Sequence, residues 1–220
     1  MRYYPVFLDL NEKACVVIGG GRVAERKVLT LLKAGARVTV VSPRVTEALR
    51  RLKEKGKIAI RRDSFRATDL KAVHLAIAAT DDRAVNEQVF RKASHLRIPV
   101  NVVDDPKHCS FIVPSIISRG DILLAISTGG LSPALAKALR KKLQSEIGQE
   151  YTVLLKIMAL VRKRIMTLGW GEREKRKIIR PLLKEDLLRM IRRKRGAEIE
   201  TFIKKNTGFE ILPAEIGLNS

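Results

Sequence analysis

The sequence of 220 residues predicts an α/β protein with a parallel sheet, followed by a small mixed α/β segment and a helical tail. Three observations predict this fold class. Short apolar runs alternate with stretches of helical period in the first half, and a glycine triplet separates the first run from the first helix. From residue 151 onward only helical patterning remains, with heavy positive charge. We therefore expect three units, at residues 1–113, 114–148 and 149–220.

The first unit reads as strands alternating with helices. Because strand–helix–strand units make right-handed crossovers, we expect all of its strands in one parallel sheet. The strands are expected over residues 14–18, 37–41, 57–61, 73–79 and 99–103, and the helices over residues 22–33, 46–55 and 84–96.

The middle segment changes the pattern. Two strands are expected over residues 111–113 and 121–127, with Arg119-Gly120 and no helix between them. Ser132-Pro133 then begins a long helix, because serine is favoured as N-cap and proline at the first helical position. The strands of this segment have no evident place in the first sheet and would present open edges. We therefore expect a homodimer built through this segment.

The glycine triplet predicts a nucleotide site. Gly19-Gly20-Gly21-Arg22-Val23-Ala24 fits G-x-G-x-x-A, with a strand before it and a helix after it. Glycine permits the tight turn and lets the backbone approach a pyrophosphate, which then lies on the helix N-terminus. We therefore expect a Rossmann-type dinucleotide site with Gly19, Gly21, Arg22 and Val23 at the cofactor. The alternative is a purely structural glycine turn.

The end of the second strand lacks the usual acid. An Asp or Glu would normally bind the ribose hydroxyls there, but the chain has Ser42, Pro43 and Arg44. The serine could bind a ribose hydroxyl, and Arg44 could accept a 2′-phosphate. These residues alone leave NAD and NADP open, with a slight preference for NADP.

The net charge of +21 has two interpretations. It is either a solvated basic surface or a surface for a polyanion, such as nucleic acid or a polycarboxylate. The basic run at 189–195 contains no aromatic residue, which argues against single-stranded nucleic acid. No apolar run approaches the roughly 18 residues that span a bilayer, and the two cysteines are too few for a disulfide framework. We expect a cytoplasmic protein with no nucleic-acid or membrane partner.

Several stretches together resemble one family. They are GGGRVAERK at 19–27, AIAATDD at 76–82, NVVDDPKHCSFIVPS at 101–115 and STGGLSPALAKALRKKL at 127–143. They resemble the precorrin-2 dehydrogenase and sirohydrochlorin ferrochelatase family, which also forms the N-terminal half of sirohaem synthase. The resemblance covers about residues 3–148. It leaves no room for a methyltransferase domain, so we expect a stand-alone form.

The resemblance implies a function and further site residues. It implies NAD-dependent oxidation of precorrin-2 to sirohydrochlorin, followed in some members by ferrous iron insertion, in a homodimer. It favours NAD over NADP and adds Thr80 and Asp81 to the cofactor site. The substrate would be a polycarboxylate tetrapyrrole, which suits the positive charge. Glycines at a helix N-terminus can receive a carboxylate, so substrate contacts are expected at Thr128, Gly129, Gly130 and Ser132; a plain helix cap is the alternative.

Asp104 is the expected general base. It directly follows the fifth strand, at the carboxyl edge where such sheets bind ligands. Oxidation by hydride transfer also releases a proton, which a carboxylate within hydrogen-bond reach can accept. The family's matching aspartate is its acid–base residue, and Asp104 occupies that place.

The residues after Asp104 have structural interpretations. Asp105 stands before Pro106 and is expected to cap a turn. His108 and Cys109 are adjacent and would be a poor pair of ligands, so no metal site is expected. His108 remains open as a secondary proton acceptor, a carboxylate partner or a packed side chain.

Two other functions remain as alternatives. An NAD-sensing regulatory module without turnover would explain the glycine loop but would leave Asp104 without a role. A nucleic-acid-binding protein rests on charge alone.

Overall fold

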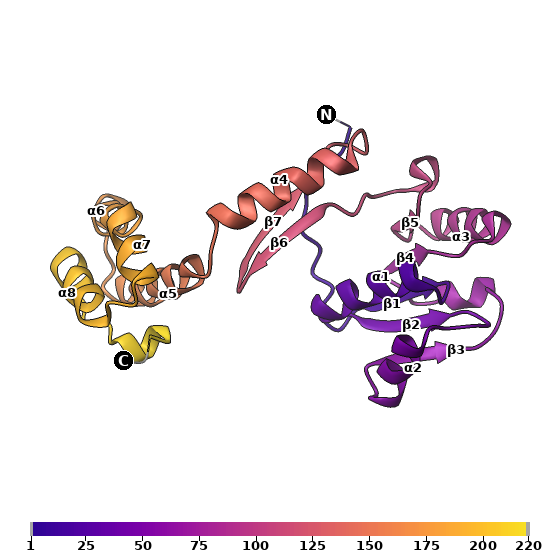
Figure 1. The fold of residues 1–220 in the computed structure, drawn as a ribbon, viewed down its shortest axis with the longest axis horizontal. Coiled ribbons are helices and arrows are strands. Elements are labelled where there is room, and N and C mark those ends of the chain that lie inside the picture. Colours follow the sequence, from indigo (N-terminus) through magenta and orange to yellow (C-terminus); the bar gives the residue numbers. More distant parts are fainter. Residues whose placement is uncertain (1, 219–220) are drawn as a thin grey trace. The chain divides into compact units, whose positions relative to one another are not determined.

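The computed structural model describes residues 2–218, which form two compact units. The first unit holds the residues up to 113 together with 129–131, and the second holds 114–128 together with the residues from 132 onward. Figure 1 shows the order of the elements along the chain.

The first unit is built on the predicted parallel sheet. Its five strands have the order β3-β2-β1-β4-β5, and every pair is parallel. The order reverses between β1 and β4, and in such sheets a ligand crevice forms at the carboxyl ends of these strands. The strands are β1 Ala14–Ile18, β2 Arg37–Val41, β3 Ile58–Arg61, β4 Leu75–Ala78 and β5 Val100–Val102.

Helices cover both faces of this sheet. Helices α1 (Arg22–Lys33) and α2 (Glu47–Glu54) pack on one face, where Val28 and Leu49 are buried against Val17 and Val40. The other face packs against α3 (Arg83–His95) and the short helix η1 (Ala67–Leu70). Strands buried on both faces read as continuous apolar runs, which is why β1 and β4 were recognisable in the sequence.

The second unit begins with an antiparallel hairpin of β6 (Ser115–Arg119) and β7 (Ile122–Ile126). The predicted strand over residues 111–113 is wrong. Phe111 instead packs against the first core, and its carbonyl accepts a hydrogen bond from Asn101 Nδ2 (3.0 Å). Phe111 is apolar because it packs against the core, and it does not pair with a strand.

The rest of the second unit is helical, as predicted. A buried cluster that includes Ile157, Val161, Leu187 and Ile203 gives residues 150–218 a core of their own. Within residues 2–218 no helix has both the length and the apolar character to cross a bilayer. The elements are α4 Pro133–Glu146, α5 Glu150–Thr167, α6 Glu172–Leu182, α7 Glu185–Arg192, α8 Gly196–Thr207 and η3 Pro213–Ile216.

Candidate active site

The first two glycines of the triplet are required by the fold itself. Gly19 has φ +120°, and a Cβ there would lie 2.2 Å from the carbonyl oxygen of Ala79. A Cβ on Gly20 would lie 2.0 Å from the carbonyl oxygen of Arg44. These contacts bring the loops after β1, β2 and β4 together at one edge of the sheet.

Gly21 differs from its neighbours. Its backbone is extended (φ −81°, ψ −175°), and a Cβ there would meet no atom within 4 Å. It is the N-cap of α1 and offers no side-chain hydrogen bond, so the first N–H groups of the helix lack a side-chain cap. An open space before an uncapped helix N-terminus fits a pyrophosphate, which is where the dinucleotide would lie.

The turn after β2 holds Ser42, Pro43 and Arg44. The Ser42 hydroxyl donates to the carbonyl oxygen of Arg44 (2.7 Å), so its proton is used within the turn. The side chains of Pro43 and Arg44 are exposed. Arg22 is likewise exposed at the start of α1.

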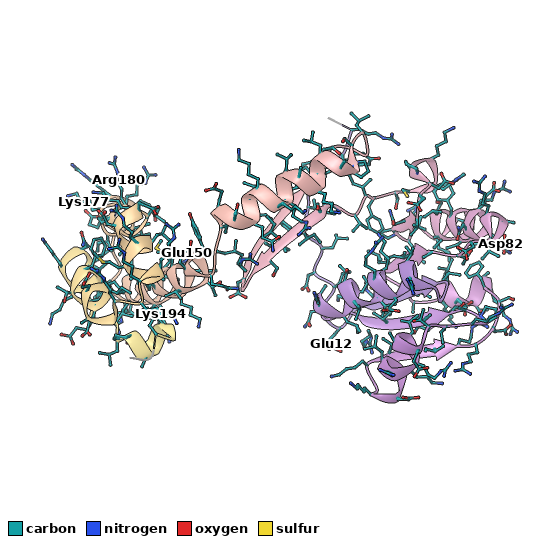
Figure 2. All side chains as sticks on the ribbon, in the orientation of Figure 1. Glu12, Asp82, Glu150, Lys177, Arg180 and Lys194 are labelled. Atoms are coloured by element: carbon teal, nitrogen blue, oxygen red, sulfur yellow. The ribbon has the colours of Figure 1, made fainter. Side chains whose placement is uncertain are left out.

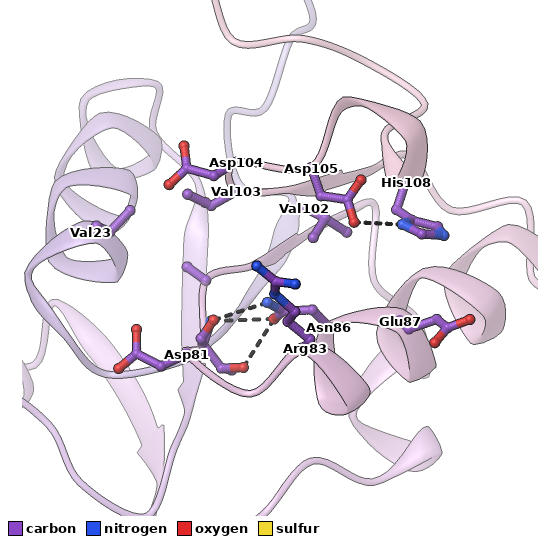
Figure 3. A pocket seen from close by; sticks show the side chains of 12 residues that line it. Val23, Asp81, Arg83, Asn86, Glu87, Val102, Val103, Asp104, Asp105 and His108 are labelled. Atoms are coloured by element: carbon purple, nitrogen blue, oxygen red, sulfur yellow. Dashed lines mark hydrogen bonds and ion pairs between the residues drawn. The ribbon is translucent and has the colours of Figure 1, made fainter.

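A pocket of about 440 Å³ lies at the carboxyl ends of β4 and β5. It brings together the predicted residues Val23, Thr80, Asp81 and Asp104, which come from three separate segments of the chain (Figure 3). The remaining wall consists of Ala79, Arg83, Asn86, Glu87, Val102, Val103, Asp105 and His108.

Asn86 fixes the position of Thr80 and was missed in the sequence. Its side chain is buried; Nδ2 donates to the Thr80 carbonyl (2.9 Å), and Oδ1 accepts from the Thr80 hydroxyl (3.0 Å). These hydrogen bonds hold the loop between β4 and α3 in place. The available signal was an asparagine on the same helical face as the buried Val89 and Ala93.

Asp104 is held in an unusual backbone conformation. Its φ is +59°, in the left-handed region that residues other than glycine rarely adopt. Such a conformation costs on the order of 1–2 kcal/mol and is often found at functional sites. Hydrogen bonds on either side fix the segment: Val103 N donates to the Ala78 carbonyl, and Asp105 N to that of Val102. The carboxylate is exposed and lines the pocket together with Val23 (Figure 3).

Lys27 is the second residue that the sequence analysis missed. Burial lowers its pKa and nearby Arg26 lowers it further, while attraction to Asp104 and Cys109 raises it. Lys27 lies one helical turn after Val23, so both lie on the same side of α1. A half-buried lysine thus interacts electrostatically with the carboxylate of Asp104, although Lys27 is not one of the residues that line the pocket.

Asp105 caps the turn, as predicted. Its Oδ1 accepts from Lys107 N (3.2 Å), and its Oδ2 lies 2.6 Å from His108 Nδ1. The hydrogen bond from His108 is the main cause of the lowered pKa of Asp105. The His108 ring also meets Phe90 edge-on, with 4.9 Å between centroids. Of the open interpretations for His108, the structure therefore shows the carboxylate partner.

The Thr-Gly-Gly loop before α4 is closed by its own hydroxyl groups. Thr128 Oγ1 donates to the Ser132 carbonyl (3.0 Å) and accepts from Ser132 N (3.1 Å), while Ser132 Oγ accepts from Leu135 N (3.2 Å). Gly129 and Gly130 have φ of +65° and +88°, with open space where a Cβ would stand. None of these four residues lines the pocket of the first unit, and their role toward substrate stays a prediction.

The parallel sheet, the glycine loop and the pocket at its carboxyl edge define a dinucleotide-binding protein of the Rossmann type. Residues 6–115 match the NAD(P)-binding family, and residues 119–146 match the central segment of sirohaem biosynthesis proteins. The chain belongs to the precorrin-2 dehydrogenase family of sirohaem biosynthesis, whose motifs it shares, and its first unit is of the NAD(P)-binding type.

Individual relatives agree with this assignment. The chain is 44% identical to a siroheme synthase of Nitrosococcus oceani over 80% of its own length, and 50% identical to one of Nitrosospira multiformis over 69%. It spans only 38% and 33% of these two proteins. A solved structure of SirC, a precorrin-2 dehydrogenase, is similar with a TM-score of 0.76 at 27% identity, over 94% of this chain and 100% of that one.

Proposed function

We propose that this chain oxidises precorrin-2 to sirohydrochlorin with NAD as the hydride acceptor. The observation that supports this most strongly is Asp104, held with a left-handed backbone in a pocket two strands away from the glycine loop. A regulatory module that only senses NAD would not need a strained carboxylate there.

The chain's own groups have distinct tasks in this reaction. When bound, NAD supplies the nicotinamide ring that accepts the hydride. The N-terminus of α1 at Gly21 would hold the pyrophosphate, and Thr80 and Asp81, which line the pocket, would contact the cofactor. As the hydride leaves with its electron pair, positive charge develops on the tetrapyrrole. The carboxylate of Asp104 stabilises that charge and accepts the proton that the substrate then loses, which completes the new double bond.

The remaining charge serves the substrate's carboxylates. A polycarboxylate is attracted by a protein of net charge +21, and such a field raises the encounter rate. We assign the loop of Thr128, Gly129, Gly130 and Ser132 to one of these carboxylates, because a helix N-terminus with glycines favours an anion. The tail from residue 151, with 17 basic and 8 acidic residues, contributes to the same field.

We further propose that the working form is a homodimer in the cytoplasm. The hairpin and α4 expose large apolar side chains, and such a surface is usually covered in solution. The side chains are Ile116, Leu123, Leu135 and Leu139, each at least 38% exposed. Light scattering at micromolar concentration should give twice the mass of the chain.

The test is an assay of the purified chain with precorrin-2 and NAD. We expect NADH and sirohydrochlorin to form in equal amounts, and subsequent addition of ferrous iron shows whether this chain also inserts the metal. NAD binding without any turnover would instead support the sensing module. Retardation of nucleic acid with steep salt dependence and no turnover would support the third function.

A further inference from the structure

The pocket is acidic, with one exception. Among the described residues, its wall contains Asp81, Glu87, Asp104 and Asp105, and Arg83 is the single lysine or arginine. Asp105 is paired with His108, and Glu87 is paired with Arg91 at 2.6 Å. Within residues 2–218 the side chain of Arg83 forms no ion pair or hydrogen bond, although carboxylates line the same pocket. An exposed guanidinium is thus left free for a ligand.

The backbone below Arg83 is fixed. Arg83 is the first residue of α3, and the preceding Asp82 caps this helix by accepting from Ala84 N (2.9 Å) and Val85 N (3.2 Å). The hydrogen bonds between Thr80 and Asn86 hold the loop on the other side. Figure 3 shows the guanidinium directed into the pocket, over Asn86. A rigid base limits the entropy lost when this side chain binds.

The strand order places Arg83 between the glycine loop and Asp104. The glycine loop follows β1, Arg83 follows the neighbouring β4, and Asp104 follows β5 beyond it. Neighbouring strands lie about 4.8 Å apart. Arg83 is therefore one strand from each of them, and it lines the same pocket as Asp104.

We propose that Arg83 binds a carboxylate of the tetrapyrrole and so fixes the substrate's orientation over Asp104. This inference rests on the proposed function. A guanidinium presents two parallel N–H donors that match a carboxylate, and such charge-assisted pairs are the stronger hydrogen bonds of proteins. The acidic groups around Arg83 repel a carboxylate elsewhere in the pocket, so this one cation determines where a carboxylate can enter. The other anion with the same chemistry is the pyrophosphate of NAD.

The experiment compares Arg83→Gln and Arg83→Lys with Lys92→Gln as control. Lys92 lies on the same helix, is exposed and does not line the pocket. Its variant therefore removes the same charge from α3 at a position outside the pocket.

KM for precorrin-2 is measured at saturating NAD, and dissociation constants for NAD and for the product sirohydrochlorin are measured by titration without turnover. We expect Arg83→Gln to raise KM and the sirohydrochlorin constant roughly 10- to 100-fold, the usual range for a lost charged hydrogen bond. Arg83→Lys should fall between, because it keeps the charge and loses the paired donors.

The outcomes are separable. A rise in the NAD constant that equals or exceeds the rise for sirohydrochlorin would overturn the inference, because the anion would then be the pyrophosphate. Unchanged constants in both titrations, or an equal effect in Lys92→Gln, would also overturn it. If the wild-type chain shows no turnover, the proposed function fails, but the sirohydrochlorin titration still decides whether Arg83 recognises the carboxylates.

Discussion

The sheet region and the helical tail have a similar excess of basic over acidic residues, but the charged side chains are arranged differently in the two regions. Residues 1–113 hold 22 basic and 12 acidic side chains, and residues 151–220 hold 17 and 8. In the first unit, groups from the ends of β1, β4 and β5 meet at one edge of the sheet. In the tail, the cations lie on the outer faces of helices around an apolar core (Figure 2). Composition alone does not separate the two regions; the parallel topology does, because it gathers residues that are distant in the sequence.

The largest expected effect concerns the glycine loop. Gly21→Asp should abolish NAD binding, because a charged side chain would fill the open space before α1 where the pyrophosphate lies. The variant should fold, since its backbone is extended and a Cβ meets no neighbouring atom. NAD titration by calorimetry, with circular dichroism for the fold, checks both statements.

The same loop provides its own control. Gly20→Ala should weaken folding itself, because its Cβ would collide with the carbonyl of Arg44. Gly21→Ala should remain folded and lose less NAD affinity than Gly21→Asp. Full NAD affinity in a folded Gly21→Asp variant would remove the loop from the cofactor site.

The next prediction concerns the tail core. Ile203 is fully buried in α8 among the apolar residues of the tail. Ile203→Ala should lower the stability of the tail by about 2–5 kcal/mol, the usual range for this truncation in a core. NAD affinity should be unchanged, because the tail core shares no residue with the sheet core. A parallel loss of NAD affinity would show that the two regions are not independent.

A smaller effect is expected from the basic face of α6. Four exposed cations lie at helical spacing on this face and form no ion pair in residues 2–218: Arg173, Arg176, Lys177 and Arg180. Figure 2 labels Lys177 and Arg180. Replacing all four cations with glutamine should lower kcat/KM for precorrin-2 several-fold at low salt and less at high salt, since steering is screened. The NAD constant should not move. An effect that does not depend on salt would argue against steering.

The smallest effect is expected at Asp105. Asp105→Ala removes a turn cap and the partner of His108, so Tm should fall by a few degrees at most. The lowered pKa of Asp105 sets the pH dependence. The pKa of Asp105 is lower in the folded protein than in the unfolded chain, where it is about 4, so the ionised carboxylate stabilises the fold above that pH. The difference in Tm between Asp105→Ala and wild type should therefore vanish as the pH falls through the folded-state pKa. Thermal melts between acidic and neutral pH would show whether it does.

The sequence predicted the sheet well because its elements are locally encoded. The buried strands β1 and β4 are continuous apolar runs, and the glycine loop and Ser132-Pro133 mark helix starts through backbone chemistry. The strand prediction at 111–113 was wrong because Phe111 packs against the first core as part of a loop. The apolar pattern of the sequence is the same for a buried loop residue and for a residue in a strand.

The pocket was only partly predictable. Asp104, Thr80 and Asp81 came from motifs, but Lys27 and Asn86 depend on how α1 and α3 rotate against the sheet. The left-handed backbone of Asp104 was also not predicted: aspartate is enriched in that region, but the sequence does not show which aspartate adopts it.

The central claim is that Asp104 handles the proton of the oxidation, and single-turnover reduction of NAD by precorrin-2 tests it most directly. Asp104→Ala and Asp105→Ala are compared with wild type at saturating NAD. We predict that Asp104→Ala lowers the rate by about a hundredfold or more and leaves the NAD dissociation constant unchanged. Asp105→Ala should have a near-normal rate. A near-normal rate for Asp104→Ala, or a larger loss for Asp105→Ala, would contradict the account and move the base to the Asp105–His108 pair.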